Sequence, residues 1–405
     1  MKIRSTTEED RDVFVATVHK AFGRFPETPD EDGGGCWWSA TEMDRNLLAV
    51  TDDGRPIGTA GSYSFELTLP GQVVVPAAGV SAVGVLPSHR RQGVLSAMMR
   101  HQLTDLRERG DFLSVLLASE PAIYGRFGYG PATYTGRLTV QRHRAAFAEP
   151  RAGIGSPGSP GSIEVLRRDE CVDVLEDVYD RYRRAQPGAL SRPPRWWALR
   201  AGQPPVAAAP RYVAVHRDAE GNANGYASYS LADGTLTVDE TIALDDIVFV
   251  ALVKFALGHD LVAQVVFKHV PHEHPVRWKF ADFSAGEASH HTEWLWVRLL
   301  DVPRALAARR WFTDGEIVLG ATDPFLGDHG RYLLTVRDGR GDCVRTEREP
   351  DLSLDVRDLG AIYLGGTAPS ALVRAGHMRV HHSGAASLAD RLFRSDVPPH
   401  CVQWF

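Results

Sequence analysis

Short apolar runs bounded by turn residues dominate the first part of the chain. They predict strands at 46–50, 58–67 and 73–85, because each run is short and rich in strand-forming residues. A predicted helix precedes them, continuing from the Thr6-x-x-Glu9 capping box through Phe22, and a longer stretch with helical spacing follows them from Val94. Strands alternating with helices predict a mixed α/β domain over residues 1–147.

The stretch with helical spacing lies between two predicted strands. Its apolar residues recur every three or four positions and stop before Gly110, which suits the left-handed position after a helix. The apolar run at 112–118 then predicts a strand buried on both faces. The apolar positions of the predicted helix are Val94, Leu95, Met98, Met99, Leu103 and Leu106.

The rest of the chain divides into two further parts, 148–292 and 293–405. The first of them opens on a Gly/Pro/Ser-rich linker at 149–162. Its pattern predicts strands at 211–216, 225–231, 235–243 and 264–268, and helices at 171–185 and 245–257. The last part is predicted to have strands at 315–319, 331–337 and 352–356, and helices at 359–363, 370–375 and 385–393.

Composition narrows the class of protein. A chain of 405 residues exceeds what one hydrophobic core usually holds, so we expect two or three domains. The formal charge of −6 and the lack of a basic block argue against nucleic-acid binding. No apolar run approaches the roughly 18 residues of a membrane span, and the polar N-terminus is unlike a signal peptide. We therefore expect a cytoplasmic protein without membrane contact, with secretion left open.

Cysteine and histidine spacing predicts no metal site. The four cysteines are scattered and are expected to be reduced thiols. They are Cys36, Cys171, Cys343 and Cys401. His272-Glu273-His274 resembles a fragment of a metal site but lacks an evident third ligand.

The loop before the predicted helix is a candidate phosphate site. Arg90, Arg91 and Gly93 lead directly into the helix, whose first N–H groups have no internal partner and carry the positive end of the helix dipole. Glycine allows a phosphate to approach the backbone, and arginine adds charge and paired donors. The alternative is an ordinary strand–loop–helix connection with two solvated arginines.

The wider segment resembles the acetyl-CoA-binding core of the GCN5-related N-acetyltransferases. Arg90, Gly93 and Leu95 occupy the marked positions of that core, with Leu95 departing from the small residue expected there. Together with Ala118-Ser119-Glu120 and the stretch 123–133, this resembles the Eis ("enhanced intracellular survival") aminoglycoside acetyltransferases of actinobacteria. The resemblance implies two tandem acetyltransferase folds followed by a sterol-carrier-protein-like domain, and a homohexamer. Only the first fold would bind acetyl-CoA, because the second lacks the arginine–glycine loop.

The resemblance also assigns the cofactor contacts. Main-chain groups of Val83, Gly84 and Val85 would pair with the pantetheine arm like an added strand. Ser119 and Glu120 would lie near the thioester, although Glu120 has competing interpretations as a general base or as a cap of the next turn. The pyrophosphate would be held by Arg90, Arg91, Gln92, Gly93, Val94, Leu95 and Ser96.

Amine acetylation needs a proton donor for the departing thiolate and an acceptor for the amine proton. Tyr124 is the candidate donor, because a phenol with a reference pKa of about 10 is protonated at neutral pH. The alternative is a core tyrosine that holds the turn at 125–130. Tyr129 is the nearest rival, and we assign it to packing.

The candidate proton acceptor is the main-chain carboxylate of Phe405. The chain ends in the apolar run 401–405, whereas free tails are usually polar. An apolar end suggests a tail fixed in a pocket, and the family resemblance implies that the terminal carboxylate is the base. A carboxylate of reference pKa near 3.5 is a poor base for an ammonium, so burial or a relaying water would have to assist. The alternative is a tail docked only for stability.

The acceptor amine is the least specified part. Acidic residues among aromatic ones suit a polyamine, although a solvated acidic loop explains them equally well. They are Phe22, Phe25, Glu27, Asp30, Glu31, Asp32, Trp37 and Trp38. Trp404 stands where the resemblance leads us to expect an acidic residue, and Trp196 and Trp197 are assigned to packing. The expected acceptors are aminoglycoside amines and lysine side chains; the alternative function is a non-catalytic lipid or CoA carrier.

Overall fold

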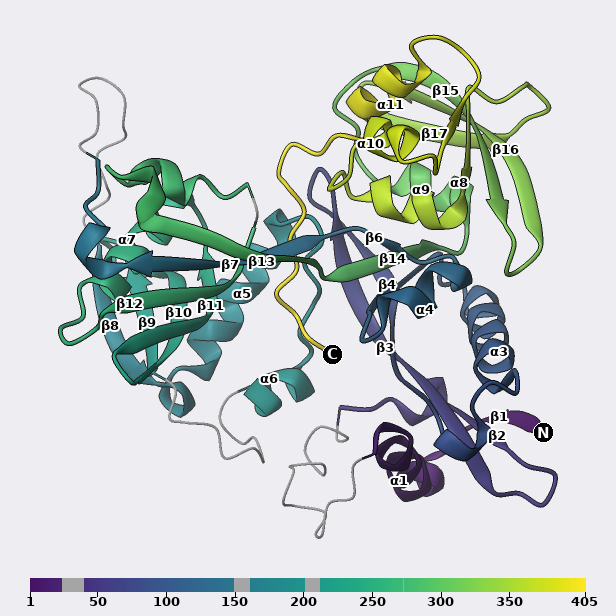
Figure 1. Ribbon diagram of the computed structural model, residues 1–405, viewed down its shortest axis with the longest axis horizontal. Helices are drawn as coiled ribbons and strands as arrows, with labels where there is room; N and C mark the ends of the chain where they lie inside the picture. The colour runs from purple at the N-terminus through teal and green to yellow at the C-terminus, as the bar shows by residue number, and fades with distance from the viewer. Residues whose placement is uncertain (24–39, 149–160, 201–211, 272) are drawn as a thin grey trace. The chain divides into compact units, whose positions relative to one another are not determined.

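The computed structural model describes residues 1–23, 40–148, 161–200, 212–271 and 273–405. The chain forms two compact units (Figure 1). The first unit comprises residues 1–133, 186–193 and 293–405, and the second comprises 134–185 and 194–292. The change of unit at 292/293 lies at an expected boundary, whereas the change at 133/134 comes before the boundary expected at residue 147. No helix in the described residues is long and apolar enough to cross a membrane.

A seven-stranded sheet forms the N-terminal part of the first unit. Its strands are antiparallel neighbours except β4 and β5, which pair in parallel. In spatial order they are β1 (Lys2–Ser5), β2 (Leu47–Val50), β3 (Pro56–Leu69), β4 (Val73–Val85), β5 (Leu113–Leu117), β14 (Leu295–Leu299) and β6 (Gly130–Pro131). In the described residues, the helices of this part are α1 (Arg11–Phe22), α3 (Val94–Glu108) and α4 (Pro121–Tyr124).

The second unit has a sheet of the same plan. Its strands are β13 (Gly286–Glu293), β7 (Tyr134–Gln141), β12 (Gln264–Val270), β11 (Thr235–Ala243), β10 (Ala223–Ala232), β9 (Tyr212–Arg217) and β8 (Ser162–Arg167). Here β11 and β12 form the parallel pair. The helices are α5 (Val172–Ala185), α6 (Pro194–Arg200) and α7 (Asp246–Leu257). The repeated order of strands confirms the tandem arrangement expected from the sequence.

The two sheets take one strand each from an unexpected stretch of chain. Strand β7 lies within the first sequence part but pairs with β12 of the second sheet. Strand β14 begins the third sequence part but pairs with β5 and β6 of the first sheet, as Figure 1 shows for β14 and β6. Apolar patterning predicts that a segment is a strand, but its pairing partner depends on tertiary contacts.

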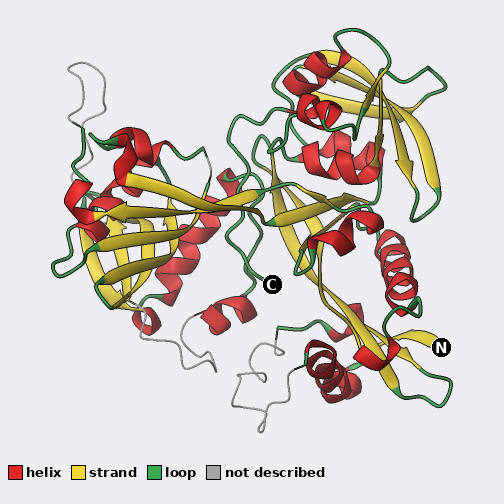
Figure 2. Cartoon of the chain, in the orientation of Figure 1, coloured by secondary structure: helices red, strands yellow, loops and turns green. Residues whose placement is uncertain are grey.

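The C-terminal part of the first unit has its own sheet with helices packed against it (Figure 2). The strands in spatial order are β17 (Arg340–Arg345), β16 (Asp328–Arg337), β15 (Gly315–Asp323), β18 (Leu352–Asp355) and β19 (Arg379–Val380). The helices are α8 (Val302–Ala308), α9 (Val356–Tyr363), α10 (Pro369–Arg374) and α11 (Ala385–Phe393). Helix α9 packs against β14 and β6 as well as β15, which joins this part to the N-terminal sheet.

Candidate functional site

Strands β4 and β5 separate after a short parallel contact. Only Ala78–Val80 of β4 pair with Ser114–Leu116 of β5, whereas β4 continues to Val85. Within the described residues, the edge of β4 from Ser81 onward therefore has no strand partner on the β5 side. An open edge of this kind can accept an extended chain through main-chain hydrogen bonds. This edge contains Val83, Gly84 and Val85.

A β-bulge lies at the point of separation. The register between β3 and β4 shifts between Thr59 and Gly61, and Ala82 opposite has a positive φ of 52°. The Thr59 hydroxyl donates to the Ala82 carbonyl at 2.8 Å. Ala82 packs against the buried cluster that contains Phe14 and Val18 of α1, whereas Val83 packs against the cluster that contains Tyr124. The bulge thus changes which residues of β4 face each side of the sheet.

The loop before α3 has the geometry of an anion site. Arg91 and Gly93 both have positive φ values, 61° and 81°, and Gly93 is the N-cap of α3 without a side-chain cap bond. A Cβ atom added at Gly93 would have no heavy atom within 4 Å, so the glycine backbone faces open space. Uncapped N–H groups at the start of a 15-residue helix beside an exposed arginine fit a diphosphate.

The loop residues differ in what they can offer. The Arg90 guanidinium donates to the main-chain carbonyls of Ala21 at 2.9 Å and Val85 at 3.3 Å, so it fastens the loop to the protein. The phosphate contact expected of Arg90 stays a prediction. Val94 is buried and Leu95 half-buried, which leaves their main-chain groups for a ligand. Their neighbours Arg91, Gln92 and Ser96 are exposed.

Tyr124 ends the short helix α4 and lies in a buried apolar cluster. That cluster also contains Ala78 and Val80 of β4 and Met99 of α3. Burial raises the pKa of Tyr124 above its ordinary value, and a hydrogen bond with the Ser119 side chain lowers it in part. The phenol is therefore held protonated at neutral pH.

The two residues before α4 lie at the protein surface. Ser119 and Glu120 are both exposed. Glu120 is the N-cap of α4 through its main chain, whose carbonyl accepts from Ile123 N at 2.9 Å, but its side chain makes no cap bond. The carboxylate is thus not used to cap the turn.

Tyr129 is fully buried, and its hydroxyl lies 2.6 Å from the Ser114 hydroxyl. Burial raises its pKa well above the ordinary value, against smaller opposing effects of Ser114 and Arg298. Its surroundings are those of a packing residue, as expected from the sequence.

The C-terminal tail is fixed within the first unit. Phe405 is 9% exposed, and its ring lies 5.0 Å from that of Phe65 in an edge contact. Gln403 is fully buried: its side-chain oxygen accepts from Arg192 at 2.7 Å, and its main-chain carbonyl accepts from Trp294 at 3.1 Å. These bonds hold the last residues of the chain against β3 and β4.

Tyr124 and Phe405 approach β4 from opposite faces. A Cβ added at Gly79 would meet the rings of Phe65 and Phe405, whereas the adjacent Ala78 and Val80 belong to the cluster of Tyr124. Neighbouring residues of a strand point to opposite faces of the sheet. Both side chains therefore lie at the level where β4 and β5 separate.

Most of the predicted acceptor residues lie outside the described residues. These are Phe25, Glu27, Asp30, Glu31, Asp32, Trp37 and Trp38, and His272 is also outside. Phe22 and Trp404 are each about half exposed, at 52% and 51%. Trp196 and Trp197 are buried in the second unit, where the Trp197 ring lies 5.7 Å from that of Tyr179. Their assignment to packing is confirmed.

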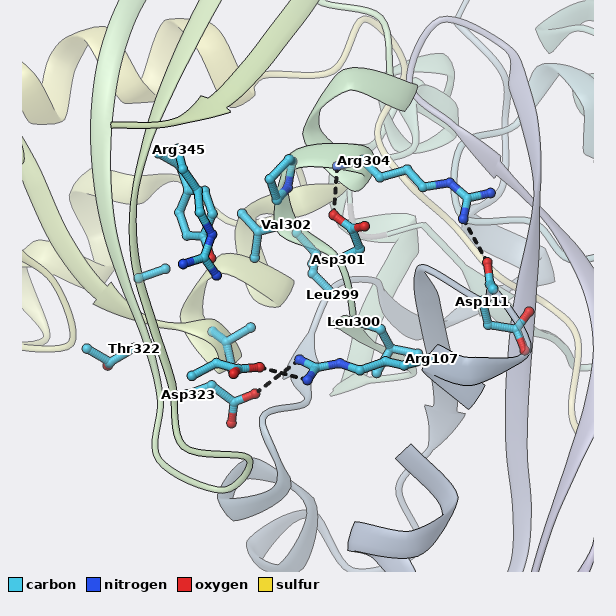
Figure 3. Close-up of a pocket in the computed structure, with 16 residues that line it drawn as sticks. Arg107, Asp111, Leu299, Leu300, Asp301, Val302, Arg304, Thr322, Asp323 and Arg345 are labelled. Atoms are coloured by element: carbon cyan, nitrogen blue, oxygen red, sulfur yellow. Dashed lines mark hydrogen bonds and ion pairs between the residues drawn. The ribbon is translucent and has the colours of Figure 1, made fainter. Parts of the chain in front are cut away.

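A pocket of about 540 Å³ lies away from the residues predicted from the sequence (Figure 3). It is formed by the end of α3, the β14–α8 segment and strands β15, β16 and β17. Neither Tyr124 nor Phe405 lines it. Charged residues such as Arg107, Asp323 and Arg345 line it together with apolar ones.

Sequence reasoning missed Arg298 and Asp323, which form a buried ion pair beside the Tyr124 turn. A signal was present in the sequence, because Arg298 stands between Val297 and Leu299 in an otherwise apolar strand. A charge at such a position must find a partner if the strand is buried.

Comparison with known proteins agrees with this architecture. Models described as acetyltransferase (GNAT) domains match residues 2–132 and 188–299, and a sterol carrier protein domain model matches 302–402. An uncharacterized N-acetyltransferase of Streptomyces avermitilis is 33% identical, across 100% of this chain and 98% of the relative. The N-acetyltransferase Eis of Mycobacterium tuberculosis is 34% identical across 97% of each chain. The crystal structure of Eis1 from Mycobacterium abscessus has a TM-score of 0.86 at 32% identity and 100% coverage of both chains.

Proposed function

The chain belongs to the Eis family of N-acetyltransferases, and from this premise we propose that it transfers acetyl from acetyl-CoA to amines of aminoglycosides, at more than one position, and of lysine side chains. The observation that carries the proposal is the placement of Tyr124 and Phe405 on opposite faces of β4 where it leaves β5. An open strand edge and an uncapped helix N-terminus beside that point support acetyl-CoA as the donor.

In this proposal the chain's own residues hold the donor and exclude water from it. Acetyl-CoA supplies the activated acyl group as a thioester. The edge Val83–Val85 and the loop Arg91–Ser96 hold the donor through main-chain groups, the Arg91 side chain and the dipole of α3. The apolar side chains packed around Tyr124 exclude water from one side of its ring.

The two proton transfers are assigned to different groups. The Phe405 carboxylate accepts the amine proton as nitrogen bonds to the carbonyl carbon, and the Tyr124 hydroxyl gives its proton to the departing sulfur. Tyr124 suits the second task because burial keeps its phenol protonated. Phe405 suits the first because its position near Gly79 is fixed by the tail.

Thiol release from acetyl-CoA, measured with a panel of aminoglycosides and basic peptides, tests this function. We expect release with aminoglycosides, and mass increases of the modified drug that correspond to whole acetyl groups. Release that occurs with peptides but never with any aminoglycoside would reject the aminoglycoside assignment.

The alternative carrier function is favoured by one observation, the pocket of about 540 Å³ formed by the C-terminal part and the end of α3. A carrier would bind a ligand there without thiol release from acetyl-CoA. The same assay therefore separates the two functions, because absence of release with every amine favours the carrier.

A further inference from the structure

The turn that carries Tyr124 is held by a charge from another part of the chain. The Arg298 side chain of β14 is fully buried, and its Nη1 donates to the main-chain carbonyl of Phe127. Its Nη2 donates to the Asp323 carboxylate. Burial lowers the pKa of Arg298, and the Asp323 charge opposes that shift. Burying a guanidinium this deeply costs free energy that only such partners offset.

Asp323, at the end of β15, is the partner of Arg298 and is itself held in place by main-chain groups. Its Oδ1 accepts from the main-chain N–H groups of Phe325 and Leu326, at 3.1 Å each. Arg107 of α3 lies 3.9 Å from its Oδ2, and Figure 3 shows these two side chains facing each other. The carboxylate therefore links the turn after β15 to β14 and α3 of the N-terminal sheet.

The Tyr124 turn has no room to move away from these contacts. A Cβ added at Gly128, which has a φ of 79°, would collide with the Arg298 guanidinium. One added at Gly130 would collide with the main chain of α9. The Phe127 ring lies 4.9 Å from the Phe325 ring in an edge contact. Residues 125–130 are thus confined by Arg298 from β14 and by Phe325 and α9 from the C-terminal part.

We propose that Arg298 and Asp323 are positioning residues that set the place of the Tyr124 hydroxyl, so that the sterol-carrier-type part of the chain acts as a rigid support for proton donation. The inference rests on the proposed function of Tyr124. Phe127 is three residues from Tyr124, and Tyr129 N bonds back to the Tyr124 carbonyl at 3.4 Å. A shift of the turn therefore moves the phenol. Displacements of about 1 Å in a catalytic group can cost about 100-fold in rate.

A double-mutant cycle between Arg298→Met and Tyr124→Phe tests the inference. If Arg298 acts through Tyr124, Arg298→Met lowers kcat about 10- to 100-fold in the parent protein and has little effect when Tyr124 is already Phe. KM for acetyl-CoA is expected to stay within about twofold, because the loop before α3 is untouched. An equal loss of kcat in both backgrounds would overturn the inference.

A second variant separates positioning from folding. Arg298→Met leaves Asp323 buried without its partner, whereas Arg298→Met with Asp323→Asn removes both charges and should recover much of the lost thermal midpoint. The donor to the Phe127 carbonyl stays absent, so kcat should stay low. If the double variant recovered kcat together with its thermal midpoint, Arg298 and Asp323 would have only a structural role, and the inference would be overturned.

Arg309→Met is the matched control. Arg309 is also almost fully buried and donates to main-chain carbonyls at the ends of α9 and α11, but it makes no contact with residues 124–130 among the bonds of the described chain. We expect a lower thermal midpoint with kcat and its pH profile unchanged. Full activity of Tyr124→Phe would reject Tyr124 as the proton donor, and absence of thiol release from the parent protein would reject the proposed function. Both outcomes differ from failure of the positioning role, in which Tyr124→Phe is impaired and Arg298→Met is not.

Discussion

At the residue scale, two tyrosines with rings 6.4 Å apart differ in what their hydroxyl groups face. Tyr129 bonds to Ser114 inside the core, whereas Tyr124 bonds to Ser119, which is exposed. The hydroxyl of Tyr124 is thus the one beside a surface that substrates can reach. The sequence placed both tyrosines in one turn, and their different partners follow from the fold.

Tyr124→Phe is expected to lower kcat by about 100-fold or more, because a positioned acid contributes about that much. The thermal midpoint should change little, since its ring packing is kept. Tyr129→Phe is the control: it loses one buried hydrogen bond, about 1 kcal/mol of the free energy of unfolding, and keeps kcat. Steady-state kinetics and thermal unfolding measure both. A Tyr129→Phe protein as inactive as Tyr124→Phe would contradict the assignment.

Alkaline pH is expected to destabilise the protein through its buried phenols. Burial raises the pKa of Tyr129 and Tyr363 above the unfolded value of about 10. The folded state therefore holds these protons more tightly, so their stabilising contribution is complete below about pH 10 and is lost as pH rises through the higher folded pKa. Thermal midpoints measured from pH 8 to 11 should fall at the alkaline end. The fall should be smaller in Tyr129→Phe, and an equal fall would reject the role of Tyr129.

At the scale of elements, helix α3 has a glycine of left-handed conformation at each end. Gly93 precedes it with a φ of 81° and Gly110 follows it with a φ of 86°, and neither would bring a Cβ within 4 Å of other atoms. Alanine at either position costs similar backbone strain, about 1–2 kcal/mol. Only Gly93 lies in the loop proposed to hold the diphosphate.

Gly93→Ala is therefore expected to raise KM for acetyl-CoA about tenfold, because the added methyl and a displaced loop weaken main-chain contacts to the diphosphate. Gly110→Ala should lower the thermal midpoint as much as Gly93→Ala does, because the backbone strain is similar, but it should leave KM for acetyl-CoA unchanged. Initial-rate kinetics at varied acetyl-CoA concentration measure the difference. Equal KM values in the two variants would argue against a diphosphate at this loop.

Elements were also the scale at which sequence patterns were most informative. The expected strand at 73–85 and the expected helix that begins at Val94 agree with β4 and α3. The bulge at Ala82 and the use of Arg90 as a structural tie were not predictable, because both depend on groups brought from β3 and α1. Local spacing does not encode such distant partners.

At the scale of the whole molecule, the end of the chain returns to the N-terminal sheet. Adding one glycine after Phe405 should leave the ring against Phe65 and move the carboxylate, so kcat is expected to fall at least about 100-fold. The dissociation constant of acetyl-CoA should not change. A glycine added before the exposed Met1 is the control and should have no effect on kcat. Full activity of the C-terminal extension would reject the carboxylate as base.

The sequence by itself determined the types of elements and the loop that opens α3, because hydrophobic period and glycine position are local properties of the chain. The tandem plan was implied by the family resemblance. The sequence also pointed to Tyr124 and Phe405 through a resemblance that spans the chain. The tertiary structure alone decided that β7 and β14 join sheets outside their sequence parts, and that Arg298 lies against the Tyr124 turn. These outcomes depend on which buried surfaces and charges find each other in the folded chain, and contacts between residues more than 100 positions apart leave no periodic trace in the sequence.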